Sequence, residues 1–158
     1  MVTMTLLGVF FGGVYETVIV GLRTVSAADR REGVRQQLTN ALELLTREAA
    51  LASNLDNAED QRLQFDADLD GNGTTENNIN YQVTSGQLQR SYNGVAVTLV
   101  NNLTALDFDY LDTAGTTLAT PVGTQATRDT IRVVDITMTA TNGAETLSLP
   151  SAVYLRDN

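Results

Sequence analysis

The feature that most constrains the fold of this chain is residues 1–22, which carry a single ionisable side chain, Glu16. A helix of this length spans about 33 Å, enough to cross a bilayer core about 30 Å thick. Gly8 and Gly12 have the spacing at which small residues let two membrane helices approach closely. We therefore expect a transmembrane or assembly helix here, with Gly8, Gly12 and Glu16 at its helix–helix contacts.

Two other interpretations fit residues 1–22 less well. A cleaved secretory signal has a basic start and an apolar run of about 7–15 residues, whereas the first base here is Arg23 and the apolar run is longer. A buried helix of a soluble domain would bear the cost of its internal glycines.

Glu16 facing lipid would cost about 3 kcal/mol. It is therefore expected to contact another helix or to lie near the membrane interface.

Residues 23–54 are expected to continue this helix as an amphipathic one, because apolar side chains recur there every three or four positions. The apolar side chains that make or adjoin this stripe are Val34, Leu38, Ala41, Leu42, Leu45, Ala49, Ala52 and Leu55. The opposite face carries Arg35, Gln36, Glu43, Arg47 and Glu48. Ser53 and Asn54 begin a polar stop. The alternative is two helices hinged near residues 27–29 or at Gly33.

Residues 55–158 are expected to form five or six antiparallel strands, with the striped half of the helix covering one face of the sheet. Two-residue periodicity and turn dipeptides such as Asn93-Gly94 and Asn142-Gly143 mark the hairpins. The predicted strands are Ile79–Val83, Gln87–Tyr92, Val95–Val100, Leu106–Tyr110, Ile131–Met138 and Glu145–Arg156. Residues 113–127 are predicted to be a loop. The fold class is therefore α+β, a long N-terminal helix packed on an antiparallel sheet.

The composition excludes many kinds of chemistry. The chain has no Cys, His, Lys or Trp, and its net charge is −9. Thiol, zinc-thiolate, Schiff-base and histidine-dependent catalysis are therefore absent. An acidic chain with scattered bases is also a poor partner for nucleic acid. The acids Asp107, Asp109 and Asp112 alternate as a solvated strand face does, so we expect no glycosidase-like carboxylate pair. We expect neither an enzyme nor a small-molecule substrate.

The segment Asp68-Leu69-Asp70-Gly71-Asn72-Gly73 is the sharpest local motif. Oxygen side chains at positions one, three and five with Gly at position six match the first half of a calcium loop. The position-twelve glutamate of such a loop is replaced by Ile79. The candidate calcium ligands are Asp66, Asp68, Asp70, Asn72, the Thr74 carbonyl and Glu76. Weak binding is expected, with Kd at about 10⁻⁴ M or above. The alternative is an Asp/Gly-rich turn that binds no ion.

Several stretches of the chain resemble type IV pilins and type II secretion pseudopilins. Residues 1–8 resemble the segment that follows the conserved glutamate of those families. The motifs Val14–Val18, Phe65–Asp70, Phe108–Asp112 and Ile131–Val134 are similar to the minor pseudopilin J family, with the minor pilin W family next nearest. The order and spacing of these short motifs, over nearly the whole chain, carry the resemblance.

The resemblance implies a single-pass protein of the bacterial inner membrane, with its C-terminal domain periplasmic or extracellular. It implies partners among other pilin or pseudopilin subunits, contacted through the N-terminal helix, and a place at the filament tip. The family's leader, cleavage glycine and glutamate do not occur in residues 1–158. Either they lie upstream of Met1 or the protein is not processed in this way. A membrane-anchored calcium-binding or adhesive domain that does not polymerise is the alternative function.

Overall fold

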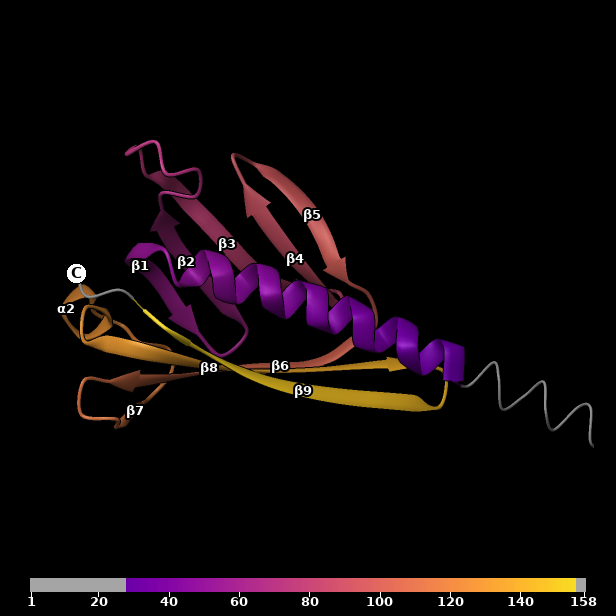
Figure 1. Cartoon of the computed structure of the whole chain (residues 1–158). Helices are drawn as coiled ribbons and strands as arrows, with labels where there is room; N and C mark the ends of the chain where they lie inside the picture. The colour runs from indigo at the N-terminus through magenta and orange to yellow at the C-terminus, as the bar shows by residue number, and fades with distance from the viewer. Residues whose placement is uncertain (1–27, 156–158) are drawn as a thin grey trace, which may run out of the picture.

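The computed structural model describes residues 28–155, which fold as an α+β domain with a long helix, α1 (28–49), packed against antiparallel strands (Figure 1). The stripe of apolar residues on α1 faces the core as predicted. Leu38, Leu45 and Ala49 have no exposed surface, and Val34 is 7% exposed. The helix is continuous through Gly33, so the alternative of a hinge at that residue is wrong.

The predicted end of the helix, at residue 54, is five residues too late. The helix ends at residue 49 and strand β1 (Ala52–Glu59) begins three residues later. Ala52 and Leu55 are buried as expected, but they lie on a strand. A spacing of three fits one face of a helix, but β1 has irregularities in its pairing with β2 on either side of Asn54 and Leu55, and these let a strand bury both positions. The backbone ladder with the next strand decides the conformation of this segment.

Five strands form the first sheet, sheet I, in the order β1-β2-β3-β4-β5. Its members are β1 (Ala52–Glu59), β2 (Arg62–Ala67), β3 (Glu76–Thr84), β4 (Gln87–Tyr92) and β5 (Val95–Val100). The last three match the predicted strands. Strands β1 and β2 occupy residues for which no strand was predicted, although Leu63, Phe65 and Ala67 of β2 alternate and are fully buried.

Four strands form the second sheet, sheet II, in the order β7-β6-β8-β9. Its members are β6 (Leu103–Asp112), β7 (Thr117–Leu118), β8 (Ile131–Asn142) and β9 (Glu145–Tyr154). In β6 the buried side chains Leu106, Phe108 and Tyr110 alternate with exposed Asp107 and Asp109, as predicted. The predicted loop at residues 113–127 holds β7 and the start of a short helix, α2 (Gln125–Arg128).

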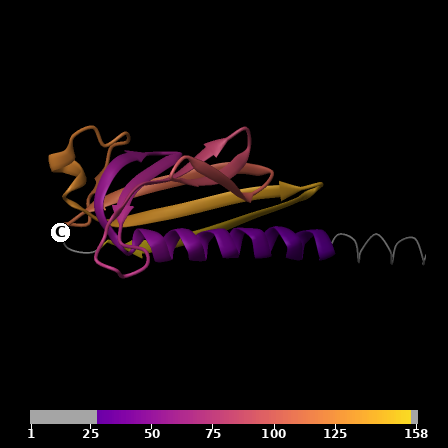
Figure 2. The same ribbon diagram turned by 90° about the horizontal axis from the view of Figure 1, so that it is seen from above.

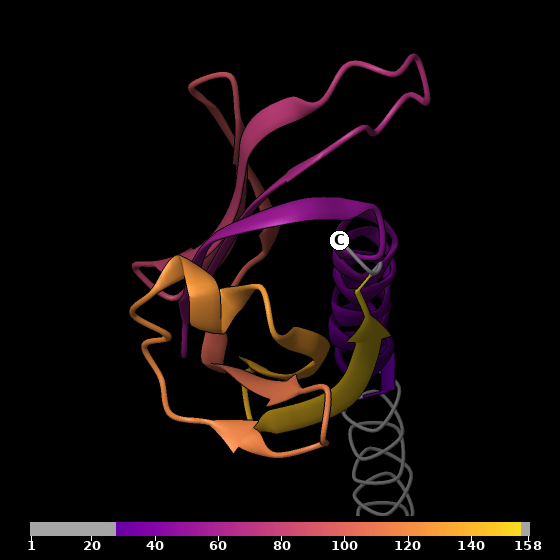
Figure 3. The same cartoon turned by 90° about the vertical axis from the view of Figure 1, so that its left-hand side faces the viewer.

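The expectation of one sheet is therefore wrong, since the strands divide between two. Backbone hydrogen bonds join the sheets where β6 passes the turn between β1 and β2: the Phe108 N–H donates to the Asp60 carbonyl at 2.9 Å. The Tyr110 hydroxyl donates to the Glu59 carbonyl at the same distance. Figure 2 shows α1 running along the two sheets, and Figure 3 shows the sheets and the helix surrounding the core.

The predicted hairpins are present. Asn93 and Gly94 both have positive φ, 51° and 75°, and the pair Tyr92–Val95 closes this two-residue loop. That geometry is the type I′ turn that the Asn-Gly dipeptide favours. The loop between β8 and β9 is displaced by one residue from its prediction, because the closing pair is Asn142–Glu145.

The predicted exposure of one residue on the polar face of α1, Glu48, is wrong. Glu48 is buried, with 6% of its surface exposed, whereas Arg35 and Glu43 are exposed. Glu48 lies near the end of α1, where the helix packs on sheet I, and it pairs with Arg90 of β4. The helical pattern places Glu48 at the border of the apolar stripe, and a cation on the opposing sheet determines its burial.

Candidate metal site in the loop between β2 and β3

The acidic motif forms the loop that joins β2 to β3. Strand β2 ends at Ala67 and strand β3 begins at Glu76, so residues 68–75 make the connection. Gly71 and Gly73 have φ of 72° and 82°. Those conformations are costly for residues with a side chain, which explains the two glycines. Gly73 thus makes the sharp turn that the calcium-loop pattern predicts at position six.

Three of the predicted ligands come together. Asp68, Asp70 and Glu76 each have a carboxylate oxygen within 4.8 Å of the others. Asp68 and Glu76 are half-buried and Asp70 is exposed. The antiparallel return of the chain places Glu76, the first residue of β3, opposite the end of β2. This gathers three negative charges at one end of sheet I.

The same carboxylates accept hydrogen bonds from the loop. Asp68 accepts from the N–H groups of Gly71 and Gly73, at 2.8 and 2.9 Å. Asp70 accepts from the N–H of Asn72 at 3.1 Å. Glu76 accepts from the N–H of Leu69 at 2.7 Å. These bonds hold the carboxylates in place and also stabilise the loop without an ion.

Asn72 and Thr74 are linked by hydrogen bonds within the loop. The Asn72 side-chain oxygen accepts from the Thr74 N–H at 2.6 Å, while its amide donates to Asp70 at 2.8 Å. Asn72 therefore braces Asp70 within the loop.

Asp66 lies apart from the three carboxylates. It is on β2, where its carboxylate accepts from the Asn78 N–H at 2.8 Å. Its close acidic neighbour is Asp56 of β1. Burial raises the pKa of Asp56, and the charge of Asp66 and a hydrogen bond with it raise this pKa further, against the opposing effects of Arg128 and Asn54. Asp56 was not singled out from the sequence, because β1 and β2 were not recognised as paired strands.

Ile79, at position twelve of the motif, is fully buried in the core. It therefore supplies no oxygen, and strand β3 replaces the second half of a calcium loop. A hard cation such as Ca²⁺ takes six to eight oxygen ligands. Three carboxylates supply part of that number and leave the rest to water. The arrangement suits weak, solvent-exposed binding of a divalent cation.

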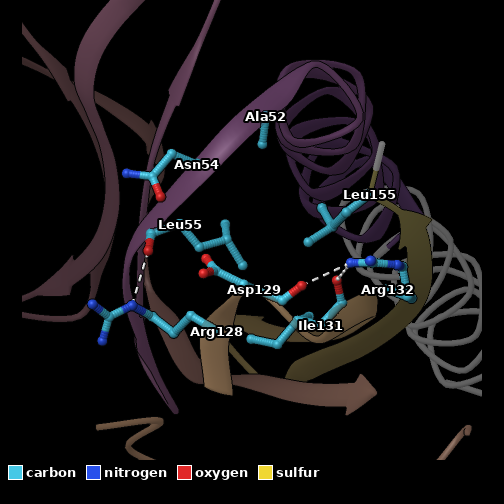
Figure 4. A pocket seen from close by; sticks show the side chains of 8 residues that line it. All are labelled: Ala52, Asn54, Leu55, Arg128, Asp129, Ile131, Arg132 and Leu155. Atoms are coloured by element: carbon cyan, nitrogen blue, oxygen red, sulfur yellow. Dashed lines mark hydrogen bonds between the residues drawn. The ribbon is translucent and has the colours of Figure 1, made fainter. Parts of the chain in front are cut away.

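A second concave feature lies where β1, α2 and β8 meet (Figure 4). Its volume is about 10 Å³, close to that of one water molecule and far below that of a ligand pocket. The residues that line it are Ala52, Asn54, Leu55, Arg128, Asp129, Ile131, Arg132 and Leu155. The guanidinium of Arg128 donates to the carbonyls of Leu55 and Val122. This place is a packed junction between elements.

The predicted assembly residues Gly8, Gly12 and Glu16, with the whole predicted membrane segment, lie outside the described residues. Within residues 28–155, no helix combines the length and apolar character needed to cross a membrane. No family model matches the chain, and no curated protein matches it.

Proposed function

We propose that this protein is a minor pseudopilin or minor pilin, a structural subunit that assembles through its N-terminal helix. Its mechanism is assembly rather than turnover. The apolar segment at residues 1–22 leaves the bilayer to pack among the helices of neighbouring subunits. The C-terminal domain selects which subunits fit beside it. In this proposal the protein starts in the inner membrane and its place is at the tip of the filament.

The observation that supports the proposal most is the way in which α1 is used. Its C-terminal part buries the apolar stripe against both sheets, whereas residues 28–33 are all exposed. The sequence that precedes this exposed start is almost free of charge. A filament subunit needs one segment fixed to its globular domain and an apolar segment that packs against other subunits. In this proposal α1 is the fixed segment and residues 1–22 are the apolar segment.

The loop between β2 and β3 supports the alternative function, a membrane-anchored calcium-binding or adhesive domain that does not polymerise. The three gathered carboxylates are the specific observation in its favour. Both functions need the membrane segment. They differ in whether the chain leaves the membrane for a filament.

The first test is fractionation of the tagged full chain in the bacterium that encodes it. We expect the chain in the inner membrane and, in part, in the filament fraction released by shearing. Gly8→Leu and Gly12→Leu should lower the filament fraction about tenfold if they remove about 1.4 kcal/mol of helix contact. Gly33→Leu is the matched control, because Gly33 is exposed and no neighbouring atom lies within 4 Å of a Cβ added there.

The outcomes separate the two functions. Membrane localisation without any filament fraction contradicts assembly and favours the non-polymerising domain. Absence from the membrane contradicts both. The DNA upstream of Met1 gives an independent check, since we expect it to encode a leader ending in Gly followed by a Thr-Leu-hydrophobic-Glu motif.

A further inference from the structure

The edges of the two sheets differ in how they are protected. An exposed edge strand offers unpaired N–H and C=O groups to any other strand, and proteins normally block it. At the β1 edge, the Leu55 carbonyl accepts from Arg128 and the Ala58 carbonyl accepts from the Val122 N–H. Strand β7 has only two residues. These two edges are closed.

The β9 edge is blocked by a proline. The loop after β8 has two residues, and its closing pair Asn142–Glu145 fixes which residues of β9 face β8. By alternation, Glu145, Leu147 and Leu149 direct their backbone groups toward β8, and the even-numbered residues direct theirs outward. Pro150 therefore lies at an outward position, where it offers no N–H.

In the described part of the chain, the β5 edge has neither a proline nor a covering contact, and the irregularity in its pairing with β4 is confined to the end of the strand, between Thr98 and Val100. Among residues 28–155, no strand pairs with its outer side. The closing pair Tyr92–Val95 directs the backbone groups of Val95 and Val97 toward β4, so Ala96 and Thr98 present theirs outward. Both outward residues are exposed, and the strand contains no proline and no charge.

The side chains of β5 add an apolar row to this edge. Val95 is 64% exposed and Val97 is 51% exposed. Val97 pairs with Arg90, whose side chain reaches Glu48 of α1. Val95 and Val97 therefore lie on the face of sheet I that α1 covers, beyond the part that the helix reaches. A strand laid along β5 would bury them with its own side chains on that face.

We infer that β5 is a docking site for an extended segment of another polypeptide, which adds to sheet I as a sixth strand. Main-chain hydrogen bonds to Ala96 and Thr98 hold the segment, and apolar side chains at alternate positions cover Val95 and Val97. Residues 91–106 contain no charged side chain, in a chain of net charge −9. The segment is therefore basic, because a chain of net charge −9 attracts a basic segment and repels an acidic one.

A second copy of this chain is a poorer occupant. Its other three edges are closed, so it would have to present its own β5 about a two-fold axis. Such an axis reverses every element that lies along the sheet, and the two α1 helices would then point in opposite directions. Two copies paired in this way could not both insert residues 1–22 into one bilayer. This step alone rests on the proposed function; the open edge does not.

The test uses the full chain in detergent and a fluorescent synthetic peptide of alternating Thr and Val with an Arg at each end. We expect binding with Kd on the order of 10⁻⁴ M. Thr98→Pro removes an outward N–H and should weaken binding at least about tenfold. Ala152→Pro is the matched control, since it places the same change on the β9 edge and should leave binding unchanged.

Two further measurements keep the inference open to contradiction. Val97→Lys keeps every backbone group of β5 but replaces an apolar contact with a positive charge, so it should also weaken binding of the Arg-ended peptide. This variant tests the inference even if Thr98→Pro fails to fold. The same peptide with Glu at its ends should bind at least about tenfold more weakly. Absence of binding, or binding that neither β5 variant changes, overturns the inference.

A self-paired chain is detected separately. The chain has no Cys, so a single Val97→Cys can be oxidised with copper phenanthroline and compared with Val95→Cys on the same strand. In the register that places residue 97 opposite its own copy, the two residues 97 would lie about 4.5 Å apart, within disulfide range, and the two residues 95 about 13 Å apart. If disulfide-linked dimers form through Cys at position 97 and not at position 95, the occupant of the β5 edge is a second copy of the chain. That result overturns the inference.

Discussion

Glu48 fixes the end of α1 to sheet I through two hydrogen bonds to one carboxylate oxygen. The Tyr81 hydroxyl donates to it at 2.7 Å and the Arg90 guanidinium at 2.8 Å. Only 8% of the Glu48 side chain and 18% of the Arg90 side chain are exposed. Burial lowers the pKa of Arg90, but the hydrogen bond and charge of Glu48 outweigh this and raise it. The arginine is therefore charged, and it forms a half-buried ion pair with Glu48.

Glu48→Ala should destabilise the protein by about 1–3 kcal/mol, because it leaves the buried Tyr81 hydroxyl and the half-buried Arg90 guanidinium without their acceptor. The measurement is the free energy of unfolding in urea. Glu43→Ala, an exposed substitution on the same helix, is the control and should change it by less than about 0.5 kcal/mol. Equal stability of the two variants would mean that the pair contributes nothing.

At the scale of elements, the loop between β2 and β3 is built to hold its shape from within. The loop glycines supply the positive φ angles, and the carboxylates of Asp68, Asp70 and Glu76 accept backbone hydrogen bonds. An ion would add to a loop that already exists. Calcium binding is therefore expected to appear as added stability rather than as folding of the loop.

Calcium should raise the melting temperature of the full chain. At a concentration of about one hundred times Kd, binding to the folded state alone adds about 2.7 kcal/mol. Asp70→Asn should abolish the shift, because it removes one of the three gathered charges. Asp107→Asn on β6, an exposed acid outside the loop, should leave it intact. An unchanged melting temperature at about 10 mM calcium would exclude the metal site, since even a Kd of about 10⁻³ M would then add about 1.4 kcal/mol.

The elements that the sequence predicted correctly are those whose signal is local. Asn93-Gly94 defines its hairpin by backbone conformation, and the alternation of Leu106, Phe108 and Tyr110 defines a half-buried strand. Strand β2 was not predicted, although Leu63 and Phe65 alternate, because the acids from Asp66 to Asp70 give the end of this segment the pattern of a calcium loop. Of the six predicted ligands, the structure gathers Asp68, Asp70 and Glu76. The pairing of β2 with β3 sets the orientation of the Asp66 side chain, and hydrogen bonds within the loop set that of Asn72.

At the scale of the whole molecule, two buried tyrosines join its layers. Tyr81 bonds sheet I to α1, and Tyr110 bonds sheet II to the Glu59 carbonyl of β1. Burial raises the pKa of both tyrosines above its usual value of 10, and nearby carboxylates add to the effect: Glu48 at Tyr81, and Asp60 and Glu59 at Tyr110. Neither phenol can ionise readily while the layers stay together.

The free energy of unfolding should therefore fall as the pH rises above about 10. Above pH 10 the tyrosines of the unfolded chain lose their protons while those of the folded chain keep them. The stability that the protonated tyrosines contribute is therefore fully present below pH 10 and decreases as the pH rises toward their pKa in the folded state. Each tyrosine contributes a slope of about 1.4 kcal/mol per pH unit. Urea unfolding between pH 9 and pH 11.5 measures this slope.

Tyr110→Phe should roughly halve that alkaline slope, because one of the two protonated phenols is removed. Tyr154→Phe is the control, since Tyr154 is 76% exposed on β9. A wild-type stability that stays constant across this pH range would show that the two phenols ionise as easily in the folded state as in the unfolded one.

Residues near one another in the chain account for the α+β class, the buried stripe of α1, most of the hairpins and the acidic loop, so these features could be predicted from the amino-acid sequence. Tertiary structure alone decided that the strands divide into two sheets, that Glu48 is buried, and that β5 keeps an open edge. These features depend on which strands pair and which faces meet. The physical reason is that burial and hydrogen-bond partners belong to pairs of distant segments, and a single stretch of sequence does not specify its partner.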